Sequence, residues 1–303
     1  MIRRPPRSTH CISSAASDVY KRQALTLISG WLRKRTPAIQ YRYAHKLAQI
    51  FYNHLVIRQK EARKNVAIAF PRYSEARREL ILKNSYIFFI RNTMQFLSFP
   101  RGYQDADITV NGKKYLDQAL EKKRGVILVT GHFGVWEIML AWFGLNQYSI
   151  LAVGQQQKNS GADIFVNQLR EDTGIKMIPR KTPLEFMYKA LASNRILMLG
   201  SDQDAKKRGV FVKFFDLPAS TPKGAARFHL EYGSPMIFAT CHLEKQNNHV
   251  LEILPIPTDS NLTVALITQS FTSMLEKAIT AYPEQYFWFH RRWKTKPPQT
   301  EST

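Results

Sequence analysis

The chain has 303 residues with 44 Lys and Arg against 23 Asp and Glu, so its formal net charge is +21, and 44% of its residues are hydrophobic. This apolar fraction is ample for a buried core and excludes a disordered protein. The length suits one large domain with appendages, and no repeat of about 20 to 50 residues indicates a repeat array. Two cysteines, Cys11 and Cys241, are too few for a disulfide framework or a thiolate metal site, which favours a reducing compartment.

The excess of basic residues is concentrated in one part of the chain. Residues 24–101 contain fifteen Lys and Arg and three acidic residues, a net charge of +12, whereas residues 1–23 carry +4 and residues 102–303 carry +5. A concentrated basic excess implies an anionic partner. No helix-turn-helix, RNP-type or zinc motif accompanies it, so an anionic membrane surface is favoured over nucleic acid. A non-enzymatic protein that binds nucleic acid or a membrane surface is the alternative.

The first 23 residues have no apolar period, no signal-peptide hydrophobic region and no helix signal. They resemble translated sequencing-adapter sequence, so we expect a non-native leader and exclude it from the fold. From residue 24, Leu25, Ile28 and Leu32 recur at helical spacing and predict a helix that borders a membrane. Further basic helices are predicted over residues 43–60, 74–84, with Ser74 as N-cap, and 86–99. No run of about 18 apolar residues predicts a membrane span.

After residue 102 the pattern alternates between strand and helix, which is typical of an α/β fold. Strands are predicted at residues 126–130, 148–153, 196–199, 210–215, 235–243 and 250–256, and helices at 133–144, 160–172, 182–193, 221–232 and 262–281. A capping box of Thr182 and Glu185, with Pro183 in the first helical position, opens the third of these helices. We expect an α/β region over residues 102–296 with a mixed central sheet flanked by helices, and a tail over 297–303.

The segment 131–137 (GHFGVWE) follows the first of these strands and carries the clearest chemical signal. A histidine at the carboxyl end of a strand lies where open α/β sheets bind their ligands. The spacing predicts that Glu137 reaches back to the His132 imidazole, with Nδ1 as donor, while Nε2 removes a proton from a hydroxyl. Such a pair fits direct transfer of an acyl group to an alcohol. The spacing alone is equally typical of a histidine that caps a helix.

A wider set of motifs makes the chain resemble the bacterial lipid A biosynthesis acyltransferases, over most of residues 24–296. The motifs are, in order, Lys64-Asn65, Phe70-Pro71, segment 131–137, Arg170 before Gly174, Ser201-Asp202-Gln203-Asp204, Val212, Phe214-Phe215, Pro218-Ala219, Thr221, Gly224, segment 282–288 (YPEQYFW) and segment 290–294 (HRRWK). Several ordered motifs together are far more specific than any one. Val135 departs from the polar residue of many members, and the usual N-terminal membrane helix is expected to be absent or cut short.

The resemblance implies a fold similar to glycerolipid acyltransferases, with a membrane-associating N-terminal helical region, and assigns roles to residues of this chain. The implied catalytic residues are His132, as general base, and its partner Glu137. Arg170 is implied to contact an anionic head group or the developing oxyanion, and Asp202, Gln203 and Thr221 are the other implied substrate-binding positions.

The resemblance also implies the reactants and the location. The donor is an acyl carrier protein thioester, with acyl-CoA as the other candidate, and the acceptor is a hydroxyl of an anionic membrane glycolipid, the lipid A precursor or a relative. Neither a metal nor an organic cofactor is implied, and no nucleic acid is expected as a partner. The expected location is the cytoplasmic face of the bacterial inner membrane. An acyltransferase of the same fold acting on a phosphoinositide mannoside, an aminolipid or a glycerophospholipid is the alternative.

Overall fold

Helices dominate the first third of the chain, and strands alternate with helices in the rest. The computed structural model describes residues 8–245, 247–258 and 262–298. The strands are β1 (Asp107–Asn111), β2 (Val126–Thr130), β3 (Ile150–Gly154), β4 (Lys176–Pro179), β5 (Ile196–Gly200), β6 (Val210–Phe214), β7 (Leu217–Thr221), β8 (Met236–Lys245) and β9 (Asn248–Pro255). The helices are α1 (Ser8–Arg33), α2 (Pro37–Ile50), α3 (Gln59–Ala69), α4 (Glu75–Leu97), α5 (Arg101–Gln104), α6 (Lys113–Glu121), α7 (Trp136–Leu145), α8 (Ser160–Glu171), α9 (Leu184–Ala192), α10 (Gly224–Tyr232) and α11 (Val264–Ala281). Short π- or 3-10 turns are η1 (Phe51–Leu55), η2 (Lys206–Arg208) and η3 (Pro283–Gln285).

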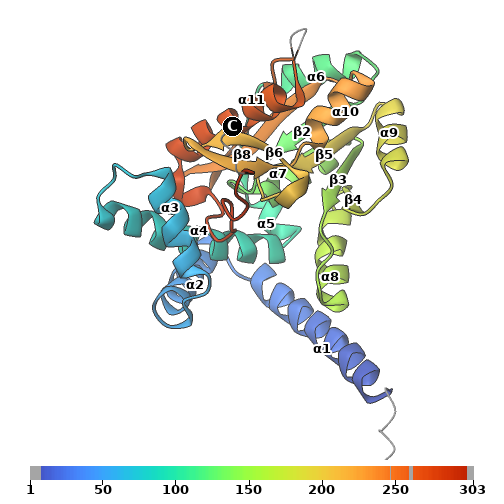
Figure 1. Ribbon diagram of the computed structural model, residues 1–303. Helices are drawn as coiled ribbons and strands as arrows, with labels where there is room; N and C mark the ends of the chain where they lie inside the picture. The colour runs from blue at the N-terminus through green and yellow to red at the C-terminus, as the bar shows by residue number, and fades with distance from the viewer. Residues whose placement is uncertain (1–7, 246, 259–261, 299–303) are drawn as a thin grey trace, which may run out of the picture.

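A mixed sheet lies at the centre of the protein (Figure 1). Within the described ranges it has seven strands in the order β1-β9-β8-β2-β5-β3-β4. The strands from β8 to β4 are parallel to one another, β9 is antiparallel to β8, and β1 is parallel to β9. A separate antiparallel hairpin joins β6 to β7. The prediction of an α/β fold with a mixed central sheet flanked by helices is confirmed.

Strand β2 explains why both faces of the sheet carry helices. Its side chains alternate between two hydrophobic clusters: Ile127 and Val129 pack with residues of α3, α9, α10 and α11, whereas Val126 and Leu128 pack with residues of α6, α7 and α8. Successive side chains of a strand point to opposite faces, so every residue of β2 is buried. A strand buried on both faces has a continuous apolar sequence, which is why its predicted bounds match the structure.

The basic N-terminal region is helical, but two predicted boundaries are wrong. The predicted helix over residues 43–60 is interrupted after η1, where Val56 and Arg58 have φ angles of 47° and 56°. The two helices predicted over 74–84 and 86–99 form the single helix α4, because neither Gly nor Pro lies between them. Ser74 caps α4 as predicted, accepting a hydrogen bond of 3.3 Å from the Arg77 backbone N–H.

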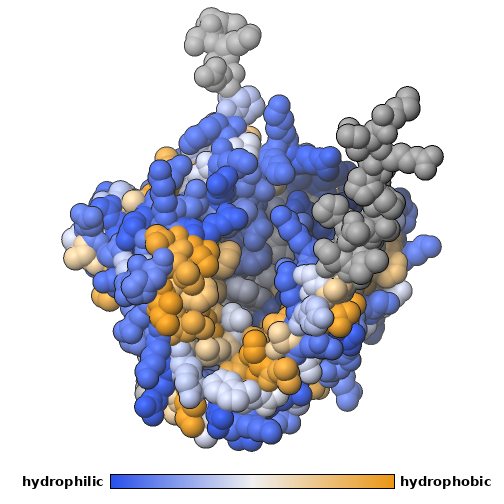
Figure 2. Space-filling model, turned by 90° about the horizontal axis from the view of Figure 1, so that it is seen from below, coloured by the Kyte–Doolittle hydropathy of each residue, from blue (hydrophilic) through white to orange (hydrophobic). Residues whose placement is uncertain are grey.

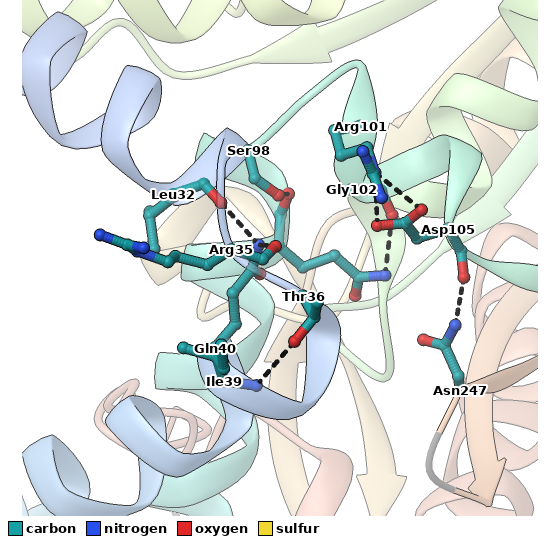
Figure 3. A network of polar contacts seen from close by, with 11 residues as sticks. Leu32, Arg35, Thr36, Ile39, Gln40, Ser98, Arg101, Gly102, Asp105 and Asn247 are labelled. Atoms are coloured by element: carbon teal, nitrogen blue, oxygen red, sulfur yellow. Dashed lines mark hydrogen bonds and ion pairs between the residues drawn. The ribbon is translucent and has the colours of Figure 1, made fainter.

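Polar contacts fix the turn between α1 and α2 (Figure 3). The Gln40 side chain donates a hydrogen bond of 3.1 Å to the Leu32 carbonyl at the end of α1. The Thr36 hydroxyl caps α2 by accepting from the Ile39 N–H. The side chain of Gln40 is buried, so this bond satisfies a polar group that would otherwise destabilise the turn.

The predicted leader is helical in part, which corrects our expectation of no helix. Helix α1 spans Ser8–Arg33, and neither Gly nor Pro occurs between Ser8 and Ser29 to interrupt it. Asp18 on this helix accepts a hydrogen bond of 2.6 Å from the Ser160 hydroxyl at the start of α8. Residues 1–7 of the leader and 299–303 of the tail lie outside the described residues. None of the helices in the described ranges is both long and apolar enough to cross a membrane.

The second half follows the predicted order with additions. The structure adds β1, α6, β4 and β7, which the sequence pattern did not predict. The predicted capping box is not formed: Pro183 is itself the N-cap of α9, and no side chain caps this end. A proline has no backbone N–H, so Glu185 lacks the donor that a capping box requires.

Candidate active site

The candidate site lies where β2 and β5 end side by side. The two strands are parallel neighbours, with Thr130 opposite Gly200 in the last pair. His132 and Asp202 each follow two residues later, so the common register brings their side chains together. After β2 the chain crosses to β3 on one side of this pair, and after β5 it crosses to β8 on the other side. Open α/β sheets bind their ligands between neighbouring strands whose connections run in opposite directions.

Asp202 holds the imidazole of His132 at two points. Its Oδ1 lies 2.7 Å from Nδ1 of the ring, and its Oδ2 accepts a hydrogen bond of 3.0 Å from the His132 backbone N–H. The Asp202 side chain is 2% exposed, whereas that of His132 is 36% exposed. An ionised carboxylate only accepts hydrogen bonds, so Nδ1 carries the proton and Nε2 is left to act as a base.

The predicted contact between Glu137 and the imidazole is wrong, because Asp202 occupies the position beside Nδ1. The Glu137 carboxylate instead accepts hydrogen bonds of 3.0 and 2.6 Å from Nε and Nη2 of Arg170 in the last turn of α8. The chain between His132 and Glu137 is not helical: Gly134 has a φ of 66° and donates its backbone N–H to the Gln285 carbonyl. Helix α7 begins only at Trp136, so helical spacing does not align the two side chains.

The electrostatic environment favours ionised Asp202 and a basic His132. Burial alone raises the pKa of Asp202, but the charge and hydrogen bonds of His132 and the charge of Arg292 lower it to about 2. Burial alone lowers the pKa of His132, but the attraction and hydrogen bond of Asp202, helped by the charge of Glu137, raise it above 6.5. A raised pKa makes the neutral imidazole a stronger proton acceptor, which suits general base catalysis.

A cavity of about 490 Å³ opens beside the imidazole. His132, Arg170 and Gln203 line it, and Gln203 Nε2 lies 3.3 Å from Nε2 of His132. Much of the remaining lining is apolar: Trp136, Leu140, Ala152, Val153, Met177, Met187, Met198 and Leu199. The His132 imidazole thus borders a cavity whose wall is apolar in large part.

Thr221 is placed differently from the other predicted site residues. It is fully buried, does not line the large cavity, and its hydroxyl accepts a hydrogen bond of 2.5 Å from Arg292 Nη2. Its prediction as a substrate contact is corrected to a support for Arg292. Within the described ranges, no three His, Cys, Asp or Glu side chains are grouped to hold a metal ion.

The family is decided by a match to the family model described as bacterial lipid A biosynthesis acyltransferase, which covers residues 20–295. The chain belongs to this family. The lipid A biosynthesis lauroyltransferase of Escherichia coli is 28% identical over 275 residues, which cover 88% of this chain and 89% of the relative. The palmitoleoyltransferase of the same bacterium is 28% identical, covering 79% of this chain and 80% of the relative.

A second kind of acyltransferase is also similar to this member of the lipid A acyltransferase family. The phosphatidylinositol mannoside acyltransferase of Mycobacterium tuberculosis is 25% identical over 191 residues, which cover 62% of this chain. The chain spans 60% of the length of that relative.

Several family motifs act as supports of the site, a role that the sequence did not reveal. Asn65 on α3 donates hydrogen bonds of 2.7 and 2.6 Å to the carbonyls of Trp288 and His290. His290 Nε2 in turn accepts a hydrogen bond of 3.0 Å from the Asp204 backbone N–H. The C-terminal segment therefore positions the loop that carries Asp202, and only the pairing of distant segments exposes this connection.

Proposed function

We propose that this protein is an O-acyltransferase that moves a fatty acyl chain from an acyl carrier protein thioester, or acyl-CoA, to a hydroxyl of a lipid A precursor or a related glycolipid. The observation that carries the proposal is the His132 ring, held through Nδ1 by Asp202 and bordering a cavity with an apolar wall. A base beside an acyl-sized chamber fits transfer to an alcohol without a covalent acyl-enzyme.

In the proposed reaction Nε2 of His132 takes the proton of the acceptor hydroxyl, and the oxygen attacks the thioester carbonyl carbon. A tetrahedral intermediate forms, the C–S bond breaks, and the thiolate leaves with the proton from the imidazolium. The Gln203 amide, beside Nε2, is a donor for the developing oxyanion. Trp136 and Phe287, with ring centroids 5.5 and 6.3 Å from that of the imidazole, exclude water that would hydrolyse the thioester.

The Glu137–Arg170 pair has a separate proposed role. Both side chains are largely buried, at 13% and 19% exposure, and Arg170 lines the cavity. Its guanidinium is held by the carboxylate in a fork with two hydrogen bonds, a geometry that fixes its orientation. Arg170 is thereby aimed at an anionic group of the substrate, and Glu137 orients it while also raising the pKa of His132 by its charge.

The N-terminal helices supply the proposed contact with the anionic membrane surface, at the cytoplasmic face of the bacterial inner membrane. Leu27, Ile28 and Trp31 on α1 are 75%, 47% and 39% exposed. Figure 2 views the side from which α1 projects and shows hydrophobic patches within a hydrophilic surface. Apolar side chains among Lys and Arg favour a surface of anionic lipid.

The proposed function is tested by incubating the purified protein with lipid A precursor and either acyl carrier protein thioester or acyl-CoA, and measuring lipid masses. A gain of one acyl residue that is lost by orders of magnitude in the folded His132→Ala variant is expected. Near-normal turnover in that variant would remove the mechanism. Phosphatidylinositol mannoside, the acceptor in the name of the mycobacterial relative, is tested in parallel. Acylation of this lipid and not of the lipid A precursor would identify it as the acceptor.

Membrane contact is tested by sedimentation with vesicles that contain or lack anionic phospholipid. The double variant Leu27→Asp and Ile28→Asp should weaken binding to anionic vesicles by about tenfold or more, because two apolar side chains no longer enter the bilayer. The control is Leu266→Asp, a leucine that is 54% exposed on α11. Equal binding of all three proteins would contradict the proposed surface.

A further inference from the structure

The motif His290–Lys294 contains an arginine that the proposed reaction does not use. Arg292 is 2% exposed and is among the largest fully buried side chains of the protein. Its Nη1 donates a hydrogen bond of 2.7 Å to the Ser220 carbonyl, and its guanidinium carbon lies 5.0 Å from the centre of the Phe214 ring. Burying a charge of this kind is costly unless another charge or set of hydrogen bonds compensates it.

The side chains of Arg292 and Asp202, which are distant in the sequence, line the same small cavity. This cavity of about 10 Å³ is lined by both side chains, together with Thr130, Ser201 and apolar residues. The Nε of Arg292 is buried and has no hydrogen-bond partner among the described protein groups. The guanidinium is therefore held near the carboxylate by its Nη atoms without forming an ion pair with it.

The other titratable groups around the His132–Asp202 pair bring no unpaired positive charge to the Asp202 carboxylate. Arg170 is engaged in its own ion pair with Glu137. Tyr286 hydrogen-bonds to Asp202 but stays neutral, because burial and the Asp202 charge raise its pKa well above 10. His290 accepts the Asp204 N–H at Nε2, and burial lowers its pKa, so it is also neutral. The Asp204 carboxylate accepts a hydrogen bond of 3.0 Å from the Thr295 hydroxyl.

We propose that Arg292 is a positioning residue whose buried positive charge stabilises the Asp202 carboxylate while His132 is neutral. The inference rests on the proposed function, because a general base must hold no proton before the reaction. In that state the buried carboxylate faces a neutral imidazole, and Arg292 supplies the charge that compensates it. Without this charge the pair retains a proton more strongly, so His132 stays protonated to a higher pH.

The test is an NMR titration of the His132 ring in the full-length protein, with the signal assigned by His132→Gln. Arg292→Gln keeps side-chain donors for Ser220 and Thr221 but removes the charge, and Arg292→Met is the second neutral variant if the first does not fold. We expect the pKa of His132 to rise by about half a unit or more, so the neutral fraction at acidic pH falls about threefold. Arg292→Lys, which keeps the charge, should leave the pKa near that of the wild type.

The matched control is Arg291→Met, since the Arg291 side chain is 58% exposed and lies 3.7 Å from Glu61. A purely structural role for Arg292 would lower stability and maximal activity without moving the His132 titration, and an unchanged or lower pKa in the neutral variants would overturn the inference. An equal rise of the His132 pKa in Arg292→Lys, which keeps the positive charge, would also overturn the inference. Failure of the wild-type protein to transfer acyl groups would instead refute the proposed function and leave the titration result intact.

Discussion

Asp202→Asn and Glu137→Gln together decide which carboxylate controls the protonation of His132. Both oxygens of Asp202 accept hydrogen bonds from His132, one from Nδ1 and one from the backbone N–H. Asparagine has only one acceptor oxygen. If that oxygen keeps the backbone bond, its amide NH₂ faces Nδ1 and forces the ring into the tautomer with the proton on Nε2, which has no basic atom toward the substrate.

The magnitude of the Asp202 effect follows from the same contacts. The pKa of Asp202 falls from 3.8 to about 2 in spite of burial, which corresponds to about 2 kcal/mol in favour of the ionised form. Loss of the correct tautomer in a comparable Ser-His-Asp site costs about 10⁴ in kcat. We therefore expect Asp202→Asn to lower kcat by about 10³ to 10⁴ and to lower the pKa of His132 below 6.5, because burial then acts without the opposing charge.

Glu137→Gln should give a different pattern, because no Glu137 oxygen bonds to the imidazole. Its loss releases Arg170 and lowers activity, while the His132 pKa stays above 6.5 because Asp202 still faces Nδ1. The assay combines acyl-transfer rates between pH 5 and 9 with NMR titration of His132 in each variant. The reasoning is refuted if Glu137→Gln brings the pKa below 6.5 while Asp202→Asn leaves it raised.

Three further outcomes are expected. In the wild type, kcat/KM should rise with pH through an apparent pKa above 6.5, because His132 must lose its proton to act as a base; a profile that is flat from pH 5 to 8 would contradict this. Met198→Trp, in the apolar lining, should shift preference toward shorter acyl donors, as measured by competition between chain lengths; an unchanged preference would exclude this wall as the acyl site. Asn65→Ala should lower the free energy of unfolding by about 2 to 4 kcal/mol in urea, since two carbonyls lose their donor, whereas exposed Lys64→Ala should change it by less than about 0.5 kcal/mol.

The sequence by itself determined the parts of the fold that depend on local signals. The run of five buried residues in β2 was predicted with its observed bounds, and Ser74 was identified as a cap, because continuous apolar runs and capping residues are local features. Strand β7 was not predicted because Pro218 is typical of a loop, although proline is tolerated in a short two-stranded hairpin.

The sequence also identified His132 and placed Asp202 at a strand end. It could not reveal that these strands are neighbours, because β5 pairs with β2 across an intervening pair of strands in the chain, β3 and β4. The tertiary structure alone decided that Asp202 holds the imidazole, that Glu137 holds Arg170, and that Thr221 supports Arg292. Each of these pairs joins residues more than about 30 positions apart, and such contacts are set by strand order and packing, which local spacing does not encode.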